Sequence, residues 1–193
     1  MALSKICTDQ KFLVEYWYMK NSYQSNREET IIAQKNSAKR TLITEYKLPK
    51  STKYIGCIDL TDPKVRDFII QWLTDLGVSV FIIGKTTVQS DFIRNVKDFS
   101  DTLLSGCDFL VSDTQTNPSR ITACILAGIV PIVPKNTPFK NMFSQFNPME
   151  FTGNSYIYEG GQYQIFASTV ALLENMKFPA DREILLKNVV KTL

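Results

Sequence analysis

Five polar residues in one stretch of the chain have the types and spacing of a phosphate-binding site: Asp113, Asn117, Ser119, Arg120 and Lys135. The first four lie in a polar loop and at the start of an apolar helix, and the fifth directly follows the next apolar strand. A helix start favours an anion, because its free backbone N–H groups and the helix dipole both attract negative charge. Arg120 and Lys135 would then bracket a phosphate. The alternative is structural, with Ser119 capping the helix and Arg120 a solvated residue of its first turn.

The segments around these residues indicate one βαβ unit of a parallel sheet. Residues 107–134 run in the order strand, loop, helix and strand, and both strands are continuous apolar runs, which indicates burial on both faces. Ligands of such sheets bind at the carboxyl ends of the strands, next to the start of a helix. Asp59, at the end of an earlier strand, is expected at the same edge as Asp113 and is a candidate carboxylate partner for it. Strand-end aspartates more often cap helices or form turns, and this interpretation is preferred for both.

Alternating strand and helix patterns continue through most of the chain. Residues 54–84 predict a second βαβ unit, with Thr61 or Asp62 capping a helix over residues 63–76. The apolar residues of this helix are expected to be buried: Val65, Phe68, Ile69, Trp72, Leu73 and Leu76. Later segments predict a short strand over residues 92–97, a short helix ending at residue 106, a short strand within residues 154–161, a helix over residues 162–176 and a last helix capped by Asp181. The pattern predicts a three-layer, Rossmann-like α/β sandwich with a mostly parallel sheet over residues 53–193.

Residues 1–52 differ from the rest and are expected to form an N-terminal appendage packed on the main domain. Residues 11–20 are rich in aromatic side chains and fit either a strand or a short buried helix. Residues 25–28 have the Ser-x-x-Glu form of a capping box, which predicts a helix through about residue 35. Residues 40–48 place Leu42, Thr44, Tyr46 and Leu48 on one side, a pattern typical of a strand.

The composition is that of a globular protein and excludes several classes of function. Hydrophobic residues make up 44% of the 193 positions and charged residues 21%, and the net charge of +3 gives no strong indication of nucleic-acid binding. No apolar run has the length of a membrane span, so a cytoplasmic or nuclear protein is expected. The chain has no histidine, which excludes His-based acid–base catalysis and His-ligated zinc. Its four cysteines form no Cys-x-x-Cys pair, and three are expected to be buried in apolar segments.

The sequence also lacks the well-marked cofactor and hydrolase motifs. It contains no Gly-rich dinucleotide motif, no Walker loop and no nucleophile elbow. Neither a cofactor nor a metal is therefore expected, and no catalytic residue can be named. The candidates that remain are the carboxylate pair of Asp59 and Asp113 and a phosphate bracketed by Arg120 and Lys135.

The segment NPSRITACILAGIVPIVPKNTPF (residues 117–139) is similar to a stretch of exostosin-like glycosyltransferases. In that family a Ser-x-Arg sequence precedes an apolar helix, which is followed by Gly-Cys-Ile-Pro-Val and then by a Pro-Phe pair. The matching positions here are Ser119, Arg120, Gly128, Pro131 and Pro138-Phe139. More broadly, residues 54–193 resemble the donor-binding half of transferases with two Rossmann domains, the GT-B architecture. The resemblance implies a domain that binds a nucleotide sugar or another phosphorylated ligand.

Two departures from that family bear on activity. Ala123 stands where such enzymes usually place a Glu that holds the ribose or sugar of the donor, and a methyl group cannot accept those hydrogen bonds. The chain is also much shorter than a two-domain transferase, so the resemblance implies that another domain or chain would complete an enzyme. We therefore expect a glycosyltransferase-like binding domain, and we leave open whether it is catalytically active or degenerate.

The sequence also resembles a BRCT domain, a protein-interaction module of a different class. In both, a first strand leads to a helix that is followed by Gly, here Gly77, and a later strand precedes a helix that begins with a basic residue. A phosphopeptide-binding BRCT domain would use Ser or Thr near the end of its first strand and a basic residue at its second helix, and Thr61 and Arg120 are the nearest equivalents. The Thr-Gly pair and the Trp of the last helix are missing. A protein partner is thus the alternative, and the glycosyltransferase-like interpretation is preferred.

Overall fold

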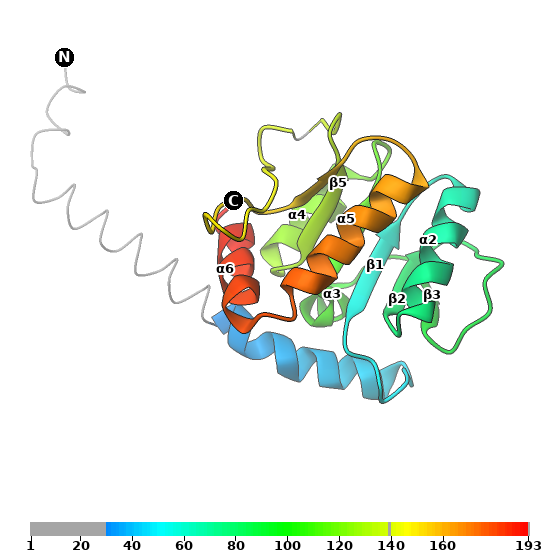
Figure 1. Cartoon of the computed structure of the whole chain (residues 1–193). Coiled ribbons are helices and arrows are strands. Elements are labelled where there is room, and N and C mark those ends of the chain that lie inside the picture. Colours follow the sequence, from blue (N-terminus) through cyan, green and yellow to red (C-terminus); the bar gives the residue numbers. More distant parts are fainter. Residues whose placement is uncertain (1–29, 139, 193) are drawn as a thin grey trace, which may run out of the picture.

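Six strands form the centre of the computed structural model, which describes residues 30–138 and 140–192 (Figure 1). In chain order they are β1 (Ile55–Asp59), β2 (Ser79–Ile83), β3 (Ile93–Val96), β4 (Phe109–Ser112), β5 (Val130–Pro134) and β6 (Tyr156–Tyr158). Their order across the sheet is β3-β2-β1-β4-β5-β6, and every pair of neighbours is parallel. The predicted Rossmann-like α/β fold with a parallel sheet is confirmed.

The two strands that flank the candidate site lie side by side and point the same way. Phe109 pairs with Val130, and Val111 pairs with Ile132. All residues of β1, β4 and β5 are buried, because helices cover both faces of the sheet. The carboxyl ends of these three strands therefore meet at one edge.

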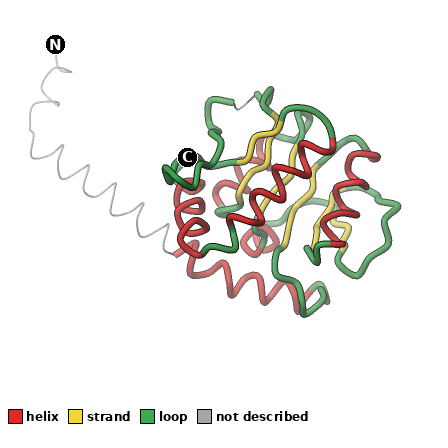
Figure 2. The backbone as a smooth tube through the Cα atoms, in the orientation of Figure 1, coloured by secondary structure: helices red, strands yellow, loops and turns green. Residues whose placement is uncertain are grey.

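The helices that come after β1 in the chain are α2 (Pro63–Asp75), α3 (Asp101–Gly106), α4 (Pro118–Leu126), α5 (Gln162–Asn175) and α6 (Pro179–Val190). α2 and α5 lie together on one face of the sheet, and α3, α4 and α6 lie on the other (Figure 1). Figure 2 shows the strands as a layer between these two sets of helices. Asp62 caps α2 by accepting from the backbone N–H groups of Lys64 and Val65, and Pro63 occupies the first turn.

Two expectations about the helices are wrong. Trp72 and Leu76 are 45% and 54% exposed, because α2 buries a narrower stripe that includes Ile70 and Leu73. The Trp72 ring instead lies 5.1 Å from the ring of Phe166 on α5, at the outer seam of the two helices. Asp181 does not cap α6, which begins two residues earlier at Pro179, since proline is favoured in a first helical turn.

The prediction of a strand over residues 40–48 is wrong, because residues 40–45 are the end of a helix over residues 30–45 and residues 46–47 form a turn. Leu42 is completely buried in the core. It therefore belongs to the buried face of a helix and not to the buried side of a strand. The helix ends before Lys47, which has a φ of 50°, and Arg94 donates to the carbonyl oxygens of Tyr46 and Lys47. The predictions for residues 11–20 and 25–28 lie outside the described residues.

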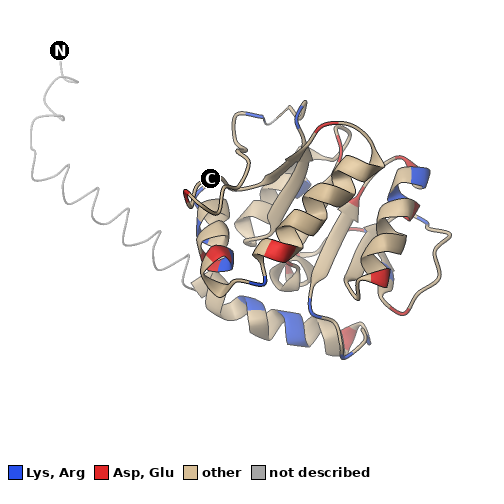
Figure 3. Ribbon diagram, in the orientation of Figure 1, with Lys and Arg blue, Asp and Glu red and all other residues tan. Residues whose placement is uncertain are grey.

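This helix crosses the amino ends of the strands and carries several Lys and Arg side chains (Figures 1 and 3). Lys39 Nζ lies 2.6 Å from the carboxylate of Asp108, which is 1% exposed and also accepts from the N–H of Ile55. A Cβ on Gly106 would lie 2.5 Å from the side chain of Leu42. Glycine at this position, the last residue of α3, therefore lets the helix of residues 30–45 approach α3 closely.

Candidate functional site

A cavity of about 930 Å³ lies at the carboxyl ends of β4, β5 and β6. This size lies within the range of small-molecule sites, roughly 300–1,000 Å³. Its apolar wall includes Val133, Pro134, Phe143, Ile157 and Tyr158. We call it the edge cavity, because it lies where ligands of parallel sheets bind.

Two lysines line the edge cavity. Lys135 directly follows β5, and its Nζ lies 2.5 Å from Glu159 Oε1, which follows β6. Both side chains of this pair are about two-thirds exposed, at 67% and 64%, so water weakens the pair strongly. Lys140 lines the same cavity and forms no ion pair with any residue that the structure describes. The cavity thus carries one weakly held cation and one unpaired cation.

Tyr158 fixes the floor of the edge cavity. It is buried, and its hydroxyl donates to the carbonyl oxygen of Ser112 over a distance of 2.8 Å. The hydroxyl thereby reaches from β6 past β5 to the end of β4. Burial and, secondarily, the nearby Asp113 carboxylate raise the pKa of Tyr158. The phenol therefore stays neutral and serves as a hydrogen-bond donor.

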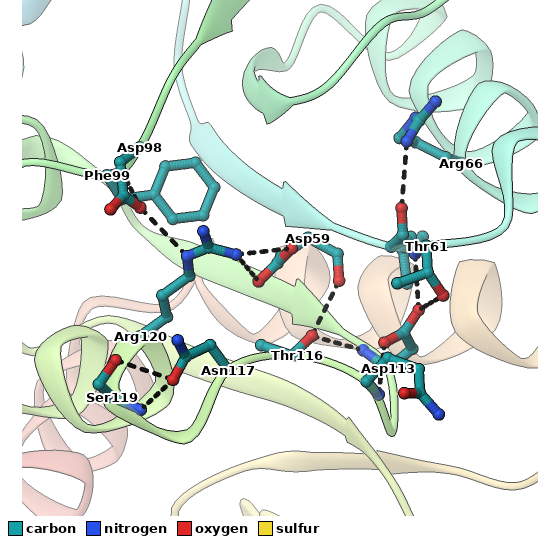
Figure 4. Close-up of polar contacts among 12 residues, drawn as sticks. Asp59, Thr61, Arg66, Asp98, Phe99, Asp113, Thr116, Asn117, Ser119 and Arg120 are labelled. Atoms are coloured by element: carbon teal, nitrogen blue, oxygen red, sulfur yellow. Dashed lines mark hydrogen bonds and ion pairs between the residues drawn. The ribbon is translucent and has the colours of Figure 1, made fainter.

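Asp113 lines the cavity, but protein donors already occupy both of its carboxylate oxygens (Figure 4). Oδ2 accepts from the N–H and the hydroxyl of Thr61, both at 2.7 Å, and Oδ1 accepts from the N–H of Gln115 at 2.8 Å. The carboxylate therefore joins the loop after β1 to the loop after β4. Thr61, the other proposed phosphate contact, is held by this bond.

Arg120 is neutralised by two carboxylates of the chain itself (Figure 4). Its Nη1 lies 3.2 Å from Asp59 Oδ2, and its Nε lies 3.1 Å from Asp98 Oδ1. Burial raises the pKa of Asp59, and the Arg120 guanidinium partly opposes this. The hydroxyl of Thr116 donates to the Asp59 carbonyl oxygen at 2.9 Å. Asp59 and Asp113, considered as a carboxylate pair, thus bind different partners.

Asn117, not Ser119, caps α4. Asn117 Oδ1 accepts from the N–H of Ser119 at 3.0 Å and from its hydroxyl at 2.9 Å. The helix start that suggested an anion site is therefore satisfied by the chain, and the expectation that Ser119 is the cap is wrong. The physical reason is the position of Pro118, which begins the helix and leaves the cap to the residue before it.

The structure divides the predicted site into two parts. Asp113 and Lys135 line the edge cavity, whereas Asn117, Ser119 and Arg120 are not part of its wall. Among the lining residues that sequence reasoning missed are Lys140, Phe143, Tyr158 and Glu159. The end of β6 was a usable signal for Tyr158 and Glu159, because the residues after a parallel strand lie at the ligand edge.

No known protein-family model matches the chain, and no curated protein matches it significantly. Ala123, which the expected resemblance to glycosyltransferases aligns with a donor-binding Glu, lines a different cavity. Within residues 30–138 and 140–192, no group of three or more Cys, Asp or Glu side chains is arranged to hold a metal. Over the same residues, no helix combines the length and the apolar character needed to cross a membrane.

Proposed function

We propose that this chain is a binding domain for a nucleotide sugar or a related phosphorylated ligand, and that the ligand occupies the edge cavity. The observation that carries the proposal is the position of this cavity, at the carboxyl edge of a parallel sheet and lined by Lys135 and Lys140. Parallel α/β sheets bind ligands at this edge. The resemblance of residues 117–139 to a glycosyltransferase donor site adds support.

The charges favour a ligand position over β4 to β6. In a sheet of this strand order, ligands commonly bind where the order reverses, here between β1 and β4. That point is occupied by the ion pair of Arg120 and Asp59, so a phosphate there would have to displace a carboxylate. A phosphate that binds Lys135 and Lys140 does not have to displace a buried carboxylate, because the partner of Lys135, Glu159, is exposed.

The wall of the cavity suggests how the ligand lies. A phosphate group binds at the lysine rim, where Lys135 leaves Glu159 to contact it. The sugar or base then contacts the apolar wall formed by Phe143 and Ile157. The side chain of Phe143 is buried, so it supplies a fixed surface at small entropic cost.

The proposal is for binding, not for a complete transfer reaction. Ala123 has no oxygen that could hold a sugar hydroxyl, and it does not line the edge cavity. Asp113 is occupied by Thr61 and Gln115 and is therefore poorly placed as a general base. Transfer activity would need groups from another domain or chain.

Calorimetric titration with a panel of nucleotide sugars, nucleoside diphosphates and inorganic phosphate tests the proposal. We expect binding by at least one nucleotide ligand and a loss of about a hundredfold in affinity for Lys135→Ala combined with Lys140→Ala, since each of the two lost contacts to a charged group is worth about 1–2 kcal/mol. Lys177→Ala is the matched control, because Lys177 is also exposed and paired with one carboxylate. Absence of binding by every ligand at millimolar concentration would reject the proposal.

The alternative, a phosphopeptide-binding module, gives a different result in the same assay. It requires a phosphorylated peptide to bind and Arg120→Ala to abolish that binding, while Lys140→Ala has no effect. It also requires Arg120 to release Asp59 and Asp98. The edge cavity gives no support to this alternative, because neither Thr61 nor Arg120 lines it.

A further inference from the structure

A second cavity lies between the helix of residues 30–45 and helices α3 and α4, and it shares no lining residue with the edge cavity. Its volume is about 370 Å³, which still lies within the range for small-molecule sites. Ile31, Ala123, Leu126 and Ala127 form an apolar wall, and Lys35 lines the same space. We call it the Lys35 cavity.

Lys35 is unusual among the described lysines because it is buried without a carboxylate partner. Its side chain is 2% exposed, and its Nζ makes one hydrogen bond, to the carbonyl oxygen of Ala127 at 3.3 Å. An ammonium group can donate three hydrogen bonds, so two of its donors remain unfilled among the described residues. Lys39, one turn further along the same helix, instead lies 2.6 Å from Asp108.

The surroundings of Lys35 favour the neutral amine. Burial lowers the pKa of Lys35 from 10.5 to about 8; Asp108 and Cys107 act in the opposite direction, and Lys39 and Arg182 lower it further. Asp101 is the one carboxylate in the wall of the Lys35 cavity, and it is exposed to solvent. A much larger fraction of Lys35 than of an ordinary lysine is therefore unprotonated near neutral pH.

The neighbouring thiols do not compete with this amine. Cys57 and Cys124 are buried, and burial raises the pKa of each thiol well above its usual value. Thiols are nucleophilic mainly as thiolates, so these two groups stay unreactive. Lys35 is then a stronger nucleophile near neutral pH than either of these two thiols.

We propose that Lys35 is a carbonyl-reactive amine and that the Lys35 cavity binds a small aldehyde with an apolar substituent. The Nζ lone pair attacks the carbonyl carbon and forms a C–N bond. The carbonyl oxygen then leaves as water with both amine hydrogens, and a neutral imine remains. A lysine desolvated in an apolar pocket has the chemistry for this step. The inference is independent of the function proposed for the edge cavity.

The test is reductive trapping with butyraldehyde and cyanoborohydride at pH 7, followed by peptide mass mapping of the folded full chain. The cyanoborohydride delivers hydride to the imine carbon and fixes the adduct. We expect Lys35 to be modified at least about tenfold faster than Lys39 or the exposed Lys177, in line with its larger unprotonated fraction. The rate should rise with pH and level off above about 8. Equal or slower modification of Lys35 would overturn the proposal.

Two controls separate reactivity from binding in the cavity. Unfolding the chain in urea should remove the advantage of Lys35 over the other lysines. Ala123→Met keeps the amine and fills part of the cavity, so it should slow trapping by butyraldehyde severalfold and leave trapping by the much smaller formaldehyde nearly unchanged. If butyraldehyde reacts equally fast with this folded variant, the aldehyde does not bind in the Lys35 cavity and the proposal fails.

Discussion

Arg120 on α4 and Asp59 on β1 form an ion pair of 3.2 Å although 61 residues separate them in the chain. The pair lies between β1 and β4, at the point where the strand order of the sheet reverses. Thr116 adds a hydrogen bond to the Asp59 backbone at the same place. The part of the sheet edge where a ligand is most often bound is therefore closed by the chain's own side chains.

Replacing Arg120 by Ala is expected to lower the free energy of unfolding by about 2 kcal/mol, because it leaves the Asp59 carboxylate without its cation. The Asp59 side chain is 11% exposed, so water cannot replace the guanidinium fully. Urea denaturation measures the change. The double variant with Asp59→Asn should recover much of the loss, and a double variant as unstable as the single one would contradict this account.

The stability of the chain should depend on pH through Lys35. Its folded pKa of about 8 lies below the ordinary value of 10.5, so between these values the unfolded chain binds more protons than the folded chain. Stability therefore rises with pH in this range, by an amount on the order of 3 kcal/mol for Lys35 alone. Other lysines titrate in the same range, and the difference from Lys35→Met isolates the effect. Parallel curves for the two proteins from pH 7.5 to 10 would contradict the lowered pKa.

Replacing Asp113 by Ala should loosen the loops after β1 and β4 together. The amide hydrogens of Thr61 and Gln115 both lose their acceptor, so their exchange with solvent is expected to become about tenfold faster, for a loss of about 1–2 kcal/mol. Hydrogen exchange followed by NMR resolves the two amides. Thr61→Val, which removes only the hydroxyl bond, should leave Gln115 unaffected.

Gly106→Ala is expected to destabilise the chain by about 1–3 kcal/mol through overpacking. The new methyl group would lie 2.5 Å from Leu42 Cδ1 and 3.0 Å from the backbone of Ala38. Thermal unfolding measures the loss. Because Leu42→Ala removes the closest atom, the same substitution should cost less in that background, and a fully additive double-mutant cycle would show that the two residues do not meet.

The sequence was sufficient to predict the sheet, because β1, β2, β4 and β5 are short apolar runs that alternate with helical patterns along the chain. It was not sufficient for residues 40–48. Leu42, Tyr46 and Leu48 fit the spacing of a strand. Leu42 also fits a helix, because it lies on the same helical face as Lys35 and Ala38. Packing against Gly106 decided between the two, and such a long-range contact leaves no local pattern.

The candidate site was predictable only where a strand end fixed it. Asp113 and Lys135 follow β4 and β5 directly and line the edge cavity. Arg120 was correctly placed near the same edge, but its two carboxylate partners, Asp59 and Asp98, come from distant segments. The sequence shows that a cationic side chain is present, but it does not show whether a carboxylate of the same chain already forms an ion pair with it.

The ion pair between Lys39 and Asp108 limits where a shortened form of this protein can begin. A fragment starting at residue 53 would lack Lys39, and the buried Asp108 carboxylate would lose the ammonium group that lies 2.6 Å from it. It would also expose the part of the core that Leu42 fills. A shortened form should accordingly keep the helix that carries Lys39 and Leu42.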